Sequence, residues 1–110
     1  MGRYRVSTLQ AAALCSVLGA VGCASAPPAP LTDLALARTA IDQAEHAGAA
    51  RTAPEELSSA RQRLSDAERL QRSDPDMART RAREAQSDAH LAQAIAEDAR
   101  TQVALSLARR

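Results

Sequence analysis

The chain has 110 residues, a formal net charge of +1 and almost no aromatic side chains. This length holds one small domain, and the balanced charge gives no electrostatic reason to expect a nucleic acid as partner. Alanine is abundant, glycine is scarce, and arginine supplies every basic side chain apart from two histidines, a composition typical of an all-α protein. Because alanine buries little surface, we expect a thin core.

The N-terminus has the three parts of a bacterial export signal. Two arginines come first, and residues 6–21 then carry no charge, over a length that suits a signal but is short for a membrane span. Residues 20–23 read Ala-Val-Gly-Cys and resemble the lipobox of bacterial lipoproteins. We therefore expect residues 1–22 to be a lipoprotein signal peptide that is cut between Gly22 and Cys23.

The resemblance to a lipobox implies a lipid anchor on Cys23 and no other cofactor. The thiol of Cys23 receives a diacylglycerol, its new amino group receives an acyl chain such as palmitate, and several acyl chains give lasting attachment to a membrane. The alternatives are an ordinary cleaved signal with an incidental cysteine, and a retained transmembrane anchor. The following Ala24-Ser25 lacks the aspartate linked to inner-membrane retention, so we expect the periplasmic face of the outer membrane in a bacterial cell envelope.

Residues 23–31 are expected to form a tether between the lipid and an alanine-rich helical domain, residues 32–110. Pro27, Pro28 and Pro30 favour the extended polyproline II conformation, which would hold the helical domain about 20 Å from the bilayer. A low-complexity spacer with no further role is the alternative.

The helical domain opens with two segments whose apolar residues recur at spacings of three and four. In the first segment, Thr32 is the expected N-cap and Gly48 the expected stop. In the second, Thr52 is the expected cap, Pro54 lies in the first turn and Glu55 completes a capping box. The two apolar stripes are Leu34, Ala37, Ile41 and Ala44, and then Leu57, Ala60, Leu64 and Ala67 with Leu70 alongside.

A third and longer helix is predicted from Pro75 to Leu107, with Ser73 or Asp74 as its N-cap. Its stripe is nearly all alanine, which lets another helix approach closely. The stripe consists of Ala78, Ala82, Ala85, Ala89, Ala92, Ala96, Ala99 and Val103. A second apolar face appears in the C-terminal half of this helix, formed by Leu91, Ile95 and Leu105.

The short linker between the second and third helices predicts an antiparallel hairpin. The first helix either folds back to complete a three-helix bundle, which we favour, or continues as an extension of the second. In both arrangements the third helix outruns the second by several turns. This excess length, with Leu91, Ile95 and Leu105, is the candidate interaction surface, and a frayed helix end is the alternative.

The sequence offers no catalytic or metal site, and we do not expect an enzyme. Asp42 and His46 share a helix face at a spacing that can hold a metal, but two ligands without a third are typical of a solvated face. Asp74 and Asp76 could pass for a pair of acid–base carboxylates, but their place at a helix start explains them as capping and dipole charges. Charged residues four apart, such as Arg38 with Asp42 and Glu68 with Arg72, are expected to pair along their own helices.

The run from Ala40 to Leu64, "AIDQAEHAGAARTAPEELSSARQRL", resembles an uncharacterised domain of bacterial envelope lipoproteins. The pattern of that family is an A-I-x-x-A-E-x-x-G-A helix, an A-P-x-E-L-x-x-A-R-x-x-L helix and then a long alanine-rich helix. An aromatic residue often precedes the Ala-Pro, where this chain has Thr52. The resemblance implies an envelope location, because relatives are often associated with, or fused to, peptidoglycan-binding domains of the outer-membrane protein A type.

Two functions are compatible with these features. In the first, the protein is a non-catalytic outer-membrane lipoprotein that serves as a helical interaction or structural module and supports envelope integrity. In the second, it is a lipoprotein regulator or chaperone-like cofactor of another periplasmic protein. The expected partners are the membrane, through the lipid anchor, an envelope protein or peptidoglycan-associated protein, and a second copy of the chain; nucleic acid is not expected.

Overall fold

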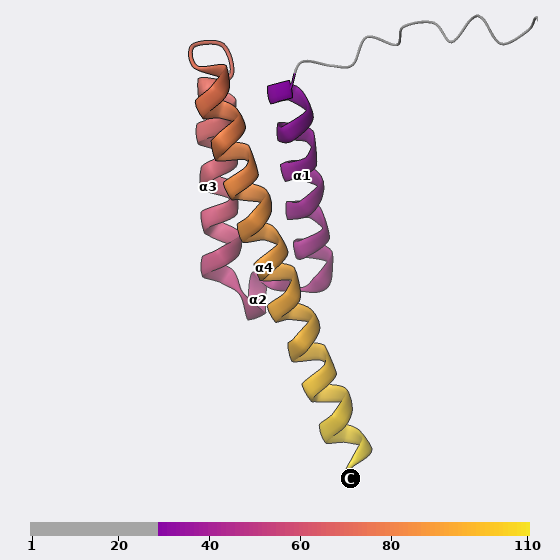
Figure 1. Cartoon of the computed structure of the whole chain (residues 1–110). Coiled ribbons are helices and arrows are strands. Elements are labelled where there is room, and N and C mark those ends of the chain that lie inside the picture. Colours follow the sequence, from indigo (N-terminus) through magenta and orange to yellow (C-terminus); the bar gives the residue numbers. More distant parts are fainter. Residues whose placement is uncertain (1–28) are drawn as a thin grey trace, which may run out of the picture.

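The computed structural model describes residues 29–110. This part of the chain is folded into four helices without a strand: α1 (Ala29–Ala47), α2 (Ala49–Thr52), α3 (Pro54–Leu70) and α4 (Pro75–Ala108) (Figure 1). The predicted all-α fold is confirmed. The predicted signal peptide, Cys23 and the greater part of the predicted tether lie outside the described residues.

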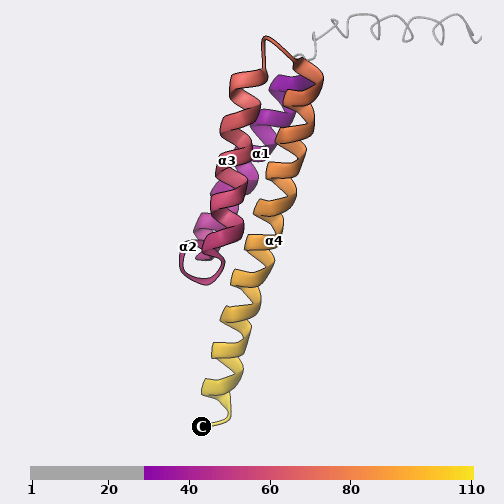
Figure 2. The ribbon, with the colours of Figure 1, turned by 90° about the vertical axis from the view of Figure 1, so that its left-hand side faces the viewer.

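The three long helices lie side by side as a bundle, with α4 packed against both α1 and α3 (Figures 1 and 2). The helix α3 runs antiparallel to α1 and α4, and the one-turn helix α2 turns the chain at the end where α1 stops (Figure 1). The first helix therefore folds back, as the bundle prediction required, instead of extending the second. A long C-terminal helix, also predicted, extends beyond the other three (Figure 2).

The core of the bundle consists mainly of alanine. The only two large side chains that are less than 2% exposed among the described residues are Leu34 and Leu57. On α4, every buried position is an alanine that is 1% exposed or less, namely Ala78, Ala82, Ala85, Ala89, Ala92 and Ala96. The predicted alanine stripe is thus confirmed as far as Ala96, and side chains as small as these allow helix backbones to approach closely.

The stripe leaves the core after Ala96. Ala99 is half-buried and Val103 is 59% exposed, although both continue the same spacing along α4. The reason lies in the neighbours, because α4 passes the end of the bundle at this point and has no further helix beside it (Figures 1 and 2).

The beginning of α1 differs from its prediction. The helix starts at Ala29, so Thr32 lies inside it and is not the N-cap. Residues 29–31, predicted as the end of the tether, form the first helical turn. Pro30 is accepted there because the N–H that proline lacks has no partner within the first turn of a helix.

The connection from α1 to α3 is partly as predicted. Gly48 ends α1, as expected, with a φ of 96° that suits glycine. Thr52 does not cap the next helix, because it lies in α2 and its Oγ1 donates a hydrogen bond of 3.2 Å to the Gly48 carbonyl. The N-cap of α3 is Ala53, without a side-chain hydrogen bond, so the predicted capping box is wrong. Ala53 is 1% exposed and packs in the core of the bundle.

The start of α4 confirms one of the two predicted caps. The carboxylate of Asp74 accepts a hydrogen bond of 3.1 Å from the Met77 backbone N–H, and Pro75 is the first residue of the helix. Asp74, and not Ser73, is therefore the N-cap.

Two ion pairs join α1 to α3, and their order along the two helices fits the antiparallel direction. Arg38 of α1 pairs with Glu68 of α3 at 2.6 Å, and Glu45, further along α1, pairs with Arg61, earlier in α3, at 2.5 Å. The expected partners within one helix are thus replaced for Arg38 and Glu68 by each other. These pairs are exposed and each contributes about 0–1 kcal/mol, so they add little to the packing of α1 against α3.

A second group of polar contacts links α4 to its neighbours. Asp88 accepts a hydrogen bond of 2.7 Å from the Ser59 hydroxyl of α3. Asp33 of α1, with only 13% of its side chain exposed, lies 3.7 Å from Arg79 and 3.5 Å from Arg83. These contacts place the start of α1 beside the first turns of α4.

Candidate interaction surface

The structure separates the three residues predicted to form an interaction surface. Leu91 is 52% exposed and Leu105 is 48% exposed, whereas Ile95 is half-buried and packs against the core. Ile95 therefore belongs largely to the bundle. Leu91 and Leu105 are about 21 Å apart along the helix, so they do not form one continuous patch.

The clearest exposed feature is the last part of α4, residues 101–108, which we call the overhang. Every residue of the overhang is exposed, and none is charged. It carries three of the seven exposed large apolar side chains of the described residues: Val103, Leu105 and Leu107, exposed by 59%, 48% and 61%. Apolar side chains grouped on an otherwise polar surface are typical of protein contacts.

The overhang has two apolar faces. Val103 and Leu107 continue the alanine stripe, at spacings of four after Ala99, and Leu105 points away from them. The sequence pattern placed Val103 in the stripe, whereas Leu107 was named only as the end of the third helix. The sequence did contain a sign of this exposed face, because the stripe changes from alanine to valine and leucine where the neighbouring helices end.

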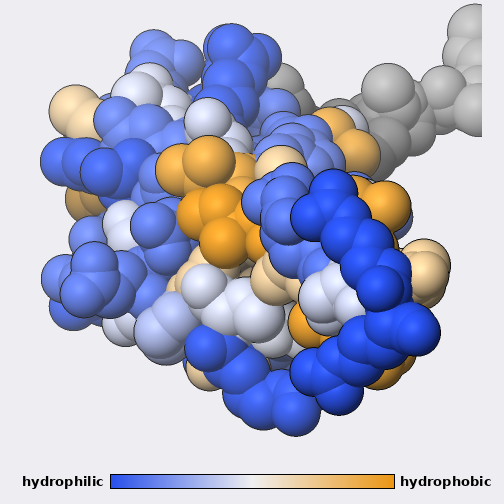
Figure 3. Space-filling view, turned by 90° about the horizontal axis from the view of Figure 1, so that it is seen from below, coloured by the Kyte–Doolittle hydropathy of each residue, from blue (hydrophilic) through white to orange (hydrophobic). Residues whose placement is uncertain are grey.

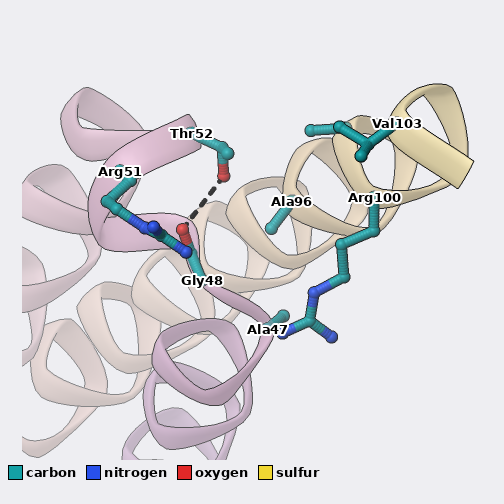
Figure 4. A pocket seen from close by; sticks show the side chains of 8 residues that line it. Ala47, Gly48, Arg51, Thr52, Ala96, Arg100 and Val103 are labelled. Atoms are coloured by element: carbon teal, nitrogen blue, oxygen red, sulfur yellow. Dashed lines mark hydrogen bonds between the residues drawn. The ribbon is translucent and has the colours of Figure 1, made fainter. Parts of the chain in front are cut away.

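A hollow of about 260 Å³ lies where the overhang begins, between the end of α1, α2 and α4. Its lining is mostly apolar, with two arginines, and consists of Ala47, Gly48, Arg51, Thr52, Ala96, Ala99, Arg100 and Val103. Figure 4 shows Ala96 and Val103 projecting from α4 toward α2, while Arg100 reaches across to Ala47.

Arg100 ties this end of the bundle together. Its Nη2 donates a hydrogen bond of 2.9 Å to the carbonyl of His46, one of the last carbonyls of α1, which lack partners within their own helix. Arg100 is thus held at the edge of the hollow. Seen from this end, apolar side chains lie between hydrophilic ones (Figure 3).

The pairs of residues considered for metal or acid–base chemistry have structural roles. The Nδ1 of His46 lies 2.7 Å from the backbone carbonyl of Asp42, and Asp74 is the cap already described. Within residues 29–110, no group of three or more His, Cys, Asp or Glu residues is placed to hold a metal ion. In the same part of the chain, no helix is both long enough and apolar enough to cross a membrane.

The described chain is therefore a small all-α bundle whose third long helix projects from it with apolar side chains uncovered. It belongs to a family defined by a domain of unknown function, DUF4398, which matches residues 32–106. The match covers α3 and most of α1 and α4, and it reaches into the overhang. No curated protein and no solved structure matches the chain.

Proposed function

We propose that the protein is an outer-membrane lipoprotein, anchored through Cys23, that acts as a non-catalytic helical interaction module in the periplasm and supports envelope integrity. The observation that carries this proposal is the overhang, whose Val103, Leu105 and Leu107 are exposed on a helix that continues past its own bundle. Such a helix has no packing reason to carry large apolar residues unless another molecule covers them.

The direction of the overhang supports the proposal. The described chain begins at Ala29, at the end of the bundle where the α3–α4 connection also lies, and the overhang is at the opposite end (Figure 1). The helix α4 is 34 residues long, which corresponds to about 51 Å. A lipid upstream of Ala29 would therefore place the overhang about 50 Å from the anchored end, facing the peptidoglycan and the proteins bound to it.

The first experiment tests the anchor. The variant Cys23→Ala is expected to remain a precursor that takes up no labelled palmitate in cells, because the acylated thiol is gone. Cys15→Ala is the matched control, since Cys15 lies inside the proposed signal peptide and its loss is expected to leave labelling unchanged. Undiminished labelling of Cys23→Ala would overturn the lipoprotein assignment.

The second experiment tests the interaction surface. Photo-crosslinking residues are placed in living cells at Val103, Leu105 and Leu107, with Ser58, exposed on α3, as the control position. We expect the overhang to trap envelope proteins or a second copy of the chain, and Ser58 to trap few. A spread of peptidoglycan-associated proteins, or self-crosslinks alone, would support the structural module, whereas one dominant protein partner would favour a regulator or chaperone-like cofactor instead. Trapping at Ser58 equal to that at the overhang would contradict both.

A further inference from the structure

The overhang carries a pattern that is complementary to itself. We infer that it pairs antiparallel with the overhang of a second copy of this chain, about a two-fold axis at Val103, with Leu107 of each copy entering the hollow of the other. The inference rests on the proposed function only in taking the overhang as an interaction surface.

The spacing of the side chains supports this pairing. At 3.6 residues per turn, Val103 lies about 40° from Ala99 and Leu107 about 40° further, so the three side chains span about 80° around the axis of α4. In an antiparallel pair centred on Val103, each Val103 faces its counterpart, and each Ala99 faces the other copy's Leu107. A small side chain thus meets a large one on both sides of the axis, which is the alternation that lets two helices interdigitate.

The hollow supplies the receiving half of the contact. Its α4 wall consists of Ala96, Ala99, Arg100 and Val103. Leu107 lies about 12 Å beyond Ala99 on the same helix, with 61% of its surface exposed. Because apolar cavities of about 150 Å³ accept benzene, a hollow of about 260 Å³ has room for a leucine side chain. In a two-fold symmetric contact each copy must supply both the hollow and the side chain that enters it, and this chain has both.

The charges around the overhang favour the antiparallel direction. Residues 101–108 are uncharged, so their overlap brings no like charges together. An antiparallel pair centred on Val103 places Arg109 of one copy level with Glu97 and Asp98 of the other. A parallel pair would instead place Arg109 beside Arg109 and Asp98 beside Asp98, which is unfavourable.

The size of the contact predicts a weak dimer. The overlap from Ala96 to Arg110 extends over about 21 Å of helix, shorter than a stable protein interface usually needs. We therefore expect association roughly in the micromolar range, strengthened where the chains are concentrated.

Cysteine crosslinking of the full chain in cells tests the axis directly. Oxidation by copper–phenanthroline is expected to link Val103→Cys into a disulfide dimer on a non-reducing gel, because the two positions face each other. Leu105→Cys is the matched control on the opposite face and is expected to stay at the level of the parent chain. A parent chain that dimerises through its own cysteine would count against lipidation of Cys23, and so against the proposed function, without bearing on the overhang.

The register is tested by mixing two variants. Co-expressed Ala99→Cys and Leu107→Cys are expected to form the mixed dimer, and each alone little or none. Leu107→Lys is expected to lower the yield of the Val103→Cys dimer about tenfold or more, because it places a positive charge beside Arg51 and Arg100 of the hollow, while Leu105→Lys leaves the yield unchanged. Equal linking at Val103 and Leu105, no linking at Val103, or self-linking at both Ala99 and Leu107 would overturn the antiparallel pair.

Discussion

The replacement of Ala89 by leucine tests whether close approach of the helices holds the bundle together. Ala89 is fully buried in a cluster that includes Ile41 and Ala44 of α1 and Leu57 of α3. An isobutyl group in place of the methyl group has to push α1 or α3 away from α4. Extra methylene groups in a packed core cost about 1–3 kcal/mol, and the helix propensities of alanine and leucine differ too little to account for such a loss.

The effect is measured by thermal unfolding, followed by far-ultraviolet circular dichroism. In a domain of this size, 1 kcal/mol shifts Tm by about 4–8 °C, so Ala89→Leu is expected to lower Tm by at least about 4 °C. The matched control is Ala94→Leu, since Ala94 is exposed on the same helix and its replacement is expected to change stability by no more than about 0.5 kcal/mol. If Ala89→Leu melts at the same temperature as Ala94→Leu or above it, the helices do not pack closely at the stripe and the reasoning is refuted.

Two further predictions concern the turns that set the ends of the helices. Gly48→Ala is expected to destabilise the protein by about 1–3 kcal/mol in urea unfolding, because a φ of 96° is costly for a residue with a Cβ. The comparison is Ala50→Gly, an exchange at an exposed position nearby. An unchanged unfolding midpoint for Gly48→Ala would show that the left-handed turn is not needed. Asp74→Ala is expected to cost about 0.5–2 kcal/mol through loss of the hydrogen bond to the Met77 N–H, with Asp74→Ser restoring most of it. A larger loss for Ser73→Ala than for Asp74→Ala would contradict the assignment of the cap.

The helices and their buried faces could be predicted closely from the residues. Spacings of three and four identified the buried side of each long helix, from Leu34 and Ala37 in α1 to Ala96 in α4. Gly48 and Asp74 marked real boundaries because each acts locally, one through its backbone freedom and the other through a bond to its own helix.

The failed predictions concern residues whose role depends on distant parts of the chain. Thr52 looked like a cap, but Ala49 and Ala53 are buried against the bundle, and their burial draws Thr52 into an extra turn of helix. Arg38 and Glu68 each had a candidate partner four residues away on its own helix. They pair with each other because the packing of α1 against α3 brings them to 2.6 Å.

The candidate interaction surface was also predicted only in part, because its exposure depends on distant parts of the chain. The sequence indicated an apolar face with Leu91, Ile95 and Leu105, but spacing along one helix does not show which neighbours cover it. The structure buries much of Ile95, leaves Leu105 uncovered and shows a further exposed side chain, Leu107, beyond the hollow on the same helix.

By itself, the sequence determined an all-α chain with alanine-rich faces and the positions of its main turns, because periodicity, glycine and caps act within a few residues. Only the tertiary structure decided at which residue α4 ceases to pack against other helices. That depends on the lengths of α1 and α3 and on how they pack, so two residues of the same stripe have opposite environments: Ala96 is 1% exposed in the core and Val103 is 59% exposed.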